Sequence, residues 1–402
     1  MTGTAGLGPL VDPGPDLGRA ELARYARQLA LPGIGADGQR RLRAARVLLV
    51  GAGGLGSPAL LYLAAAGVGT LGVVDDDVVE TSNLQRQVIH GESDVGRPKT
   101  ASAAAAVREI NPHVDVVEHG VRLTPGNALD VLAGYDLVLD GSDAFATRYL
   151  VSDAAEILGL PCVWGALHRF TGQVSTFWAA PRARDGDEPR GVTYRDLFPV
   201  PPPPGASPDC ATAGVLGAVC GTIGTTMATE AIKLITGAGR TLLGRLAVHD
   251  ALQGTWRTLT VHPDPDREPV TELLSGPGDA AGTDPYAVFC GIGGTGQHPA
   301  GLSAAELAAE RDRGAAPLVL DVREAWEVAA DPFPGARTVP SGAFTGPEAG
   351  RVVSDVAGWA GGGVVHVLCA SGVRSARVAE ELGRAGIEAR SVAGGTTGTG
   401  RR

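Results

Sequence analysis

The chain has 402 residues, of which 44% are hydrophobic and 19% charged, as in an ordinary globular protein with room for two domains. Its formal net charge of −10 argues against nucleic-acid binding, which requires a basic surface. The five cysteines form no CxxC pair, and such a scattered set is typical of a protein in a reducing cytoplasm.

The first domain is expected to span residues 19–262, after a flexible tail at 1–18 that has no signal-peptide pattern. Short apolar runs alternate there with helical stretches, which favours parallel pairing and a doubly wound, Rossmann-like α/β sheet. Strands are expected at 47–50, 71–75, 114–121, 137–140 and 162–167, helices after the first strand up to Ala66 and at 99–110, and extending strands at 173–178 and 245–252.

Two irregular stretches break this pattern. A Pro-rich crossover loop is expected at 181–208 and an interdomain linker at 263–300. The weakly polar run 211–237 contains Glu230 and Lys233, which favours a buried interface helix over a membrane span.

A second, smaller α/β domain is expected at 301–402. Its predicted elements are a helix at 305–313, strands at 318–322 and 364–368, and a helix at 374–385.

A glycine loop follows the first strand of the first domain. The run Gly51-Ala52-Gly53-Gly54-Leu55-Gly56 has the GxGxxG spacing, which alone fits NAD, FAD, ATP or merely a tight turn. Asp75, at the end of the next strand, is placed to hydrogen-bond a ribose.

The residues after this strand decide between the nucleotides. Arg86 and Lys99 follow it, and Asp143 follows a later strand, so all three are expected at one sheet edge. Each alone could be a solvated surface charge, but together they can neutralise a triphosphate and hold Mg²⁺. Hydride transfer needs neither, and the chain has no GxxxxGK[ST] loop, which excludes a P-loop NTPase.

Cys369 stands where an apolar strand gives way to a helix in the second domain. Its loop is Cys369-Ala370-Ser371-Gly372-Val373-Arg374-Ser375. Unpaired backbone N–H groups, the helix dipole and Arg374 are expected to favour the thiolate and to cradle a persulfide.

An ordered series of motifs between about residues 20 and 262 resembles the ubiquitin-activating E1-like family, and within it the bacterial molybdopterin-synthase and thiazole-synthesis adenylyltransferases. The motifs are Arg24-Tyr25-x-Arg27-Gln28, the glycine loop, the Asp75 strand end, SNLQRQ at 82–87, Gly96-x-Pro98-Lys99 and DGSDA at 140–144. The resemblance implies ATP-dependent adenylation of the C-terminal Gly-Gly carboxylate of a small ubiquitin-like sulfur-carrier protein.

The resemblance also implies site residues. The expected ATP contacts are Gly51, Gly53, Gly54, Gly56, Asp75, Ser82, Asn83, Leu84, Gln85, Arg86, Lys99, Asp143 and Ala144. Arg86 and Asp143, with Mg²⁺ on Asp143, are expected to act in catalysis. Arg27 would reach the phosphates from the partner subunit, so a homodimer is expected.

The chain departs from this family at two points. Many relatives hold a structural zinc with two CxxC pairs, whose places are taken here by 192–196 and 262–266, so no structural zinc is expected. Ala144 replaces an Asn of the family, so this residue is expected to contact the nucleotide through its backbone only.

The second domain, over about residues 300–396, resembles a single-domain rhodanese. The resemblance rests on Asp321-Val322-Arg323-Glu324, Pro334-Gly335-Ala336 and the Cys369 loop. A cysteine-phosphatase loop would need Arg at 375, where this chain has Ser. The resemblance implies that Cys369 carries sulfur as a persulfide, although the usual final helix with Trp does not follow Gly395.

The remaining cysteines are less informative. Cys210 opens the long helix, and the matching cysteine of E1-like relatives forms a thioester or acyl disulfide with the carrier. The alternative is a buried small hydrophobe, which is also expected for Cys162 and Cys220. Cys290 has no assignment.

The sequence therefore predicts an adenylyltransferase joined to a sulfurtransferase. The alternatives are an adenylyltransferase whose degenerate rhodanese domain docks partners, and an NAD-dependent oxidoreductase. The carrier, its pathway and the sulfur donor, thiosulfate or a persulfide-bearing desulfurase, stay open.

Overall fold

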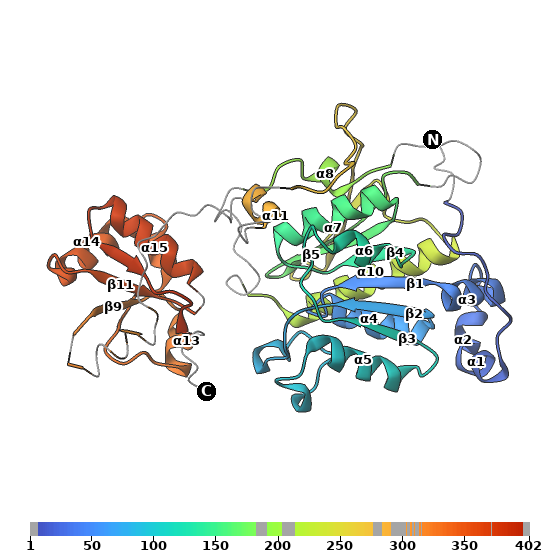
Figure 1. Ribbon diagram of the computed structural model, residues 1–402, viewed down its shortest axis with the longest axis horizontal. Coiled ribbons are helices and arrows are strands. Elements are labelled where there is room, and N and C mark those ends of the chain that lie inside the picture. The colour runs from blue at the N-terminus through green and yellow to red at the C-terminus, as the bar shows by residue number, and fades with distance from the viewer. Residues whose placement is uncertain are drawn as a thin grey trace. The chain divides into compact units, whose positions relative to one another are not determined.

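The computed structural model describes residues 7–181, 191–202, 214–275, 284–290, 316–370 and 372–396, with 303, 306–307, 309 and 313–314 between them. The chain divides into two compact units, Met1–Gly293 and Gly294–Arg402, each drawn in Figure 1. Cys210, Ser371 and most of the helix expected at 305–313 lie outside the described residues.

An eight-stranded sheet in the order β3-β2-β1-β4-β5-β6-β7-β8 forms the centre of the first unit. Its strands are β1 (Arg46–Val50), β2 (Thr70–Val74), β3 (Asp115–His119), β4 (Leu137–Asp140), β5 (Cys162–His168), β6 (Thr171–Phe177), β7 (Arg245–Asp250) and β8 (Thr255–Thr260). The first five pair in parallel and the last three continue antiparallel.

The strand order reverses between β1 and β4, which is the switch point of a doubly wound sheet. The predicted Rossmann-like α/β fold is therefore confirmed, as is the extension by β6 and β7. The edge strand β8 was not predicted because all of its residues are exposed, so it carries no alternation of buried and exposed positions.

Helices cover both faces of this sheet (Figure 1). The helices packed in one core are α3 (Gly35–Ala44), α4 (Gly56–Ala66), α5 (Lys99–Ile110) and α10 (Gly217–Thr236), and those in the other are α6 (Ala128–Leu132), α7 (Phe145–Leu158), α8 (Tyr194–Leu197) and α11 (Pro285–Phe289). The short helices α1 (Arg19–Arg24) and α2 (Ala26–Leu29) precede α3. α11 falls within the stretch expected as a linker and packs on α7.

The long helix α10 lies within the weakly polar run 211–237, for which the sequence favoured a buried helix over a membrane span. Glu230 is buried on it and accepts a hydrogen bond from the backbone N–H of Leu242 (2.6 Å). Among the helices of the described residues, none is both long and apolar enough to cross a membrane.

The second unit has a four-stranded parallel sheet in the order β10-β9-β11-β12. Its elements are β9 (Leu318–Asp321), α13 (Ala325–Ala330), β10 (Arg337–Thr338), α14 (Ala349–Ala360), β11 (Val365–Leu368), α15 (Val373–Arg384) and β12 (Ala389–Ser391). β11 is entirely buried and ends one residue before Cys369, which therefore lies at the carboxyl edge of this sheet.

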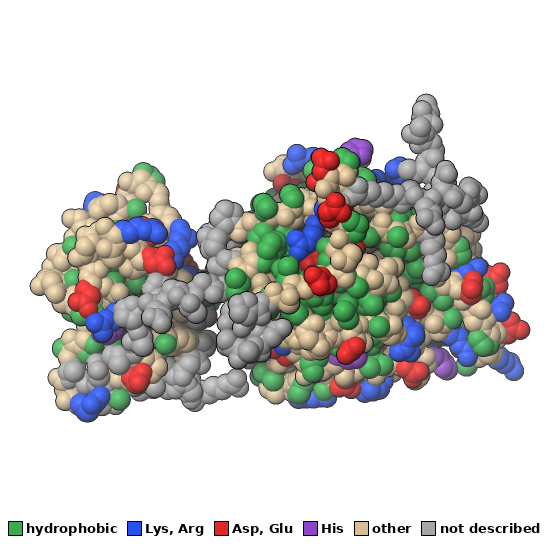
Figure 2. All heavy atoms as spheres, turned by 45° about the horizontal axis from the view of Figure 1, so that its top comes forward, with side chains coloured by type: hydrophobic (Ala, Val, Ile, Leu, Met, Phe, Trp, Pro, Cys, Tyr) green, Lys and Arg blue, Asp and Glu red, His purple; other side chains and the backbone are tan. Residues whose placement is uncertain are grey.

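Acidic and basic side chains are interspersed on the face of the molecule drawn in Figure 2, with no continuous basic area. On this face the distribution agrees with the negative net charge of the chain.

Candidate functional site

A pocket of about 420 Å³ opens at the carboxyl edge of the large sheet, at its switch point. Residues after β1, β2 and β4 converge there because the ends of parallel strands share one edge. The predicted residues that line it are Gly51, Gly53, Gly54, Asp75, Asn83, Arg86, Lys99, Asp143 and Ala144.

The glycine loop is held through the backbone N–H group and the carbonyl oxygen of Ala52. The backbone N–H of Ala52 donates to Oδ2 of Asp75 (2.9 Å), and its carbonyl oxygen lies 3.1 Å from Nε2 of the buried His90. Burial raises the pKa of Asp75 and lowers the pKa of His90. Gly56 begins α4 so close to the loop that an added Cβ would lie 1.9 Å from the carbonyl oxygen of Gly51, so only glycine fits there.

Basic groups lie around the glycine loop. Lys99 is almost fully buried and donates to Oδ2 of Asp77 (2.8 Å). Arg86 donates to the carbonyl oxygen of Ser82 (2.9 Å). These contacts leave both cations on the pocket wall, where a polyphosphate can meet them.

Some predicted residues lie outside the pocket wall. Ser82 and Gln85 are exposed, and Leu84 is half-buried. Gly56 lies against the carbonyl oxygen of Gly51 and does not line the pocket. Arg27 is exposed on α2 and does not line the pocket of its own chain. The structure thus brings Arg86, Lys99 and Asp143 together, and leaves Arg27 apart.

Sequence reasoning missed several lining residues. Gln87 is 4% exposed and its Oε1 atom has no hydrogen-bond partner, and such an orphaned atom in a pocket indicates a ligand. Gln87 belongs to the SNLQRQ motif, which was a signal for it. Arg148 and Cys220 also line the pocket. Cys220 is 1% exposed, as its expected core position requires.

The pocket fits a magnesium nucleotide. Asp143 is an exposed carboxylate on its wall, and Mg²⁺ usually binds one or two carboxylates together with substrate phosphates. Among the described residues, Asp75, Asp76 and Asp77 form the one group of three close carboxylates. Two of the three are already engaged, by Ala52 and by Lys99.

A structural zinc does not fit the two places that carry thiolate pairs in many E1-like proteins. The first place holds Arg195 and Asp196, and the second holds Asp264. Arg195 donates to Oδ1 of Asp153 (2.7 Å), and the backbone N–H of Asp264 donates to Asp196 (2.9 Å). Arg195 and Asp196 are thus already engaged, and neither place offers the thiolates that a structural zinc site uses.

Cys369 is fully buried in the second unit. Its Sγ accepts hydrogen bonds from the backbone N–H groups of Gly372 (3.1 Å) and Ser375 (3.4 Å) and lies 3.3 Å from Oγ of Ser375. Gly372 has a φ of 96°, which few residues other than glycine adopt. The loop therefore points backbone dipoles at the sulfur, as an anionic sulfur atom requires.

Comparison with known proteins agrees with this geometry. Residues 25–270 match the ThiF family. A probable adenylyltransferase/sulfurtransferase of Mycobacterium tuberculosis, MoeZ, is 47% identical over 386 residues, which are 95% of this chain and 93% of that protein.

A further relative and a solved structure each match about two thirds of the chain. A sulfur carrier protein adenylyltransferase of Thermus thermophilus is 49% identical over 280 residues, 68% of this chain and 98% of that protein. The crystal structure of Escherichia coli MccB with MccA-N7isoASN has a TM-score of 0.52 at 18% identity, and covers 62% of this chain and 75% of that one. At that identity the second likeness concerns the fold alone.

Proposed function

The chain belongs to the ThiF family, and we propose that it adenylates a ubiquitin-like sulfur-carrier protein and then transfers sulfur to it. The adenylyltransferase is assigned to the first unit and the sulfurtransferase to the second. The observation that carries the proposal is the convergence of the glycine loop, Asp75, Arg86, Lys99 and Asp143 on one pocket.

The first half-reaction activates a carboxylate. An oxygen of the carrier's C-terminal glycine attacks the α-phosphorus of ATP, an acyl adenylate forms, and pyrophosphate leaves. Lys99 and Arg86 are placed to offset the phosphate charge, and Asp75 and His90 hold the loop that borders the pocket. Fixing two reactants in one geometry is worth roughly 7–11 kcal/mol of barrier.

Mg²⁺ would be held by Asp143 and would neutralise charge on the phosphates. We assign no zinc to the described residues, because the two places concerned offer no thiolates and are held by an ion pair and a backbone hydrogen bond instead.

The second half-reaction uses Cys369. Its persulfide attacks the acyl carbon and AMP leaves, which gives an acyl disulfide between Cys369 and the carrier. A thiol reductant then supplies two electrons and cleaves the sulfur–sulfur bond, so that the carrier leaves as a thiocarboxylate. Cys210 is the candidate resolving thiol, and thiosulfate or a desulfurase persulfide is the candidate donor.

A homodimer is part of the proposal. Arg27 is exposed and lies off the pocket wall of its own chain, so its assigned contact with the phosphates would be made in a second copy.

Intact-mass spectrometry tests both half-reactions at once. Gly-Gly-ended carriers are incubated with the full-length protein, Mg-ATP and thiosulfate, and exchange of one terminal oxygen for sulfur is expected. The Cys369→Ala variant should stop at the adenylate. Thiocarboxylate formation by this variant would refute the role of Cys369, and no change with any carrier would refute the carrier assignment.

A further inference from the structure

Helix α7 carries three polar side chains at positions four and three residues apart, which is the spacing of one helix face. Tyr149, Asp153 and Glu156 each bind a group from another part of the chain. These groups lie in residues 192–198 of the crossover segment and in the two described stretches 264–275 and 284–290, so one helix binds all three.

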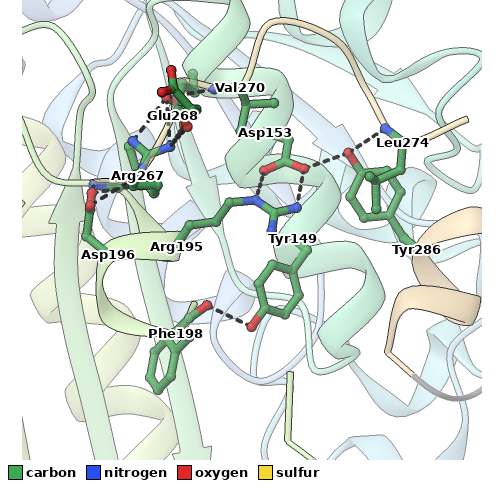
Figure 3. Close-up of polar contacts among 12 residues, drawn as sticks. Tyr149, Asp153, Arg195, Asp196, Phe198, Arg267, Glu268, Val270, Leu274 and Tyr286 are labelled. Atoms are coloured by element: carbon green, nitrogen blue, oxygen red, sulfur yellow. Dashed lines mark hydrogen bonds and ion pairs between the residues drawn. The ribbon is translucent and has the colours of Figure 1, made fainter. Parts of the chain in front are cut away.

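Arg195 is the centre of the first contact. It forms a two-pronged ion pair with Asp153 (2.7 and 2.8 Å), and its guanidinium lies 5.1 Å from the ring centres of both Tyr149 and Phe289. Tyr286 of α11 donates its hydroxyl to the same carboxylate (2.8 Å), as Figure 3 shows. Three elements, α7, α8 and α11, thus meet at a single carboxylate that is almost wholly buried.

Arg267 is the centre of the second contact. It binds Glu156 (3.1 Å) and Asp196 (3.2 Å), and the side chains of these two acids are 5% and 0% exposed. Asp196 also accepts from the backbone N–H groups of Thr193 (2.7 Å) and Asp264 (2.9 Å). Residues 192–196 and 262–266, the two stretches that carry the zinc ligands in many E1-like proteins, are therefore joined through Asp196.

These contacts extend toward the nucleotide pocket. Tyr194, next to Arg195, packs its ring against Trp164 (5.5 Å between centres). Trp164 lies under the guanidinium of Arg148 (5.8 Å), which donates to the carbonyl oxygen of Ser142 (3.1 Å), next to Asp143.

We propose that Asp153, Glu156, Arg195, Asp196, Arg267 and Tyr286 form an ion-pair clamp that replaces the structural zinc and positions the 140–143 loop of the nucleotide pocket. The first part rests on the contacts alone, and the positioning part rests on the proposed function of the pocket. The clamp residues are positioning residues, because none of them lines that pocket.

The physical reason lies in the burial of these charges. A buried ion pair contributes little compared with an apolar pair of the same shape, but removal of one partner leaves an unpaired buried charge. Two arginines with several hydrogen bonds each hold their neighbours in one geometry, as tetrahedral zinc does.

The first test needs neither nucleotide nor carrier. Elemental analysis of the purified full-length protein should find far less than one zinc per chain, and EDTA should leave the melting temperature unchanged. One zinc per chain, whose removal lowers the melting temperature, would overturn the replacement.

Arg195→Met should lower the melting temperature by about 10 °C. The double variant Asp153→Leu/Arg195→Met should recover much of this loss, because it leaves no unpaired charge. The matched control is Arg351→Met, since Arg351 and its partner Glu348 are both exposed (68% and 72%) and such pairs are worth little. A loss no larger than that of the control would overturn the clamp.

The positioning part is tested by calorimetric titration with Mg-ATP, well below the melting temperature. Arg195→Met should weaken binding roughly threefold to tenfold, and Arg195→Lys should weaken it less. An unchanged dissociation constant in a destabilised variant would overturn the positioning role. Failure of the wild-type protein to bind Mg-ATP would instead count against the proposed function.

Discussion

The guanidinium of Arg374 forms a two-pronged ion pair with the carboxylate of Glu327, with both nitrogen–oxygen distances at 2.6 Å. Arg374 belongs to the Cys369 loop and lies in the first turn of α15, and Glu327 lies on α13, so the pair joins two helices. The hydrogen bond and charge of Arg374 contribute to lowering the pKa of Glu327. The sulfur of Cys369 receives its hydrogen bonds from backbone N–H groups instead.

Arg374→Met should therefore reduce thiosulfate-to-cyanide sulfur transfer by only about fivefold, or about 1 kcal/mol of barrier, because its guanidinium binds Glu327 and donates no hydrogen bond to the sulfur among the described contacts. The N–H groups of Gly372 and Ser375 remain in place to hold the persulfide. Steady-state kinetics of the full-length protein measures this, with Cys369→Ala as the inactive reference. A loss as complete as that of the reference would show that the charge of Arg374 acts on the sulfur.

Gly56→Ala should damage the nucleotide pocket. Its Cβ would lie 1.9 Å from the carbonyl oxygen of Gly51, and relief of such a clash costs about 1–3 kcal/mol or displaces the loop. Mg-ATP binding should weaken about tenfold or more, as measured by calorimetry. Gly221→Ala on α10 is the control, since its Cβ would have nothing within 4 Å and alanine favours a helix by about 1 kcal/mol.

Stability should fall with acidification through His90. Burial lowers its pKa below the ordinary 6.5, so the unfolded chain binds a proton that the folded chain does not. The free energy of unfolding should therefore decrease as the pH is lowered below about 6.5, by up to about 1.4 kcal/mol per pH unit.

The check is chemical denaturation between about pH 5 and pH 7.5, in the wild type and in His90→Gln. The glutamine amide can still donate to Ala52 but does not titrate in this range. The free energy of unfolding should change less steeply with pH in the variant than in the wild type. The contribution of His119, whose pKa is also lowered by burial, should remain in both proteins. Identical slopes would exclude His90 as a titrating group.

Complementation between two inactive variants should reveal whether Arg27 acts across a dimer. Arg27→Ala and Asp143→Asn should each lose adenylation. A heterodimer of the two has one site with both groups if Arg27 acts in the partner subunit, so about half of the wild-type rate is expected. Pyrophosphate exchange on purified, differently tagged heterodimers measures it, and an inactive mixture would place Arg27 in its own chain's site.

The alternation of strands and helices could be predicted because it depends on short-range patterns of apolar and polar residues. The strand ends at Val50, Val74 and Asp140 follow from apolar runs, and parallel pairing then brings those ends to one edge. The glycine spacing likewise requires only a tight turn. For these reasons the sequence alone predicted the fold and that Asp75, Arg86, Lys99 and Asp143 share one pocket, but not that Arg122 and Arg148 line it too.

Only the tertiary structure decided which partner each charge takes. Arg374 pairs with Glu327, 47 residues away, and Tyr286 reaches Asp153 across 133 residues. Such pairs leave no periodic signal, because any acid and any base of suitable length can meet once the backbone has folded. Packing decides which do, since a buried charge is tolerated only beside its partner. Sequence by itself thus determined the scaffold and part of the pocket lining, and three-dimensional packing determined the rest of the lining and the contacts that hold it.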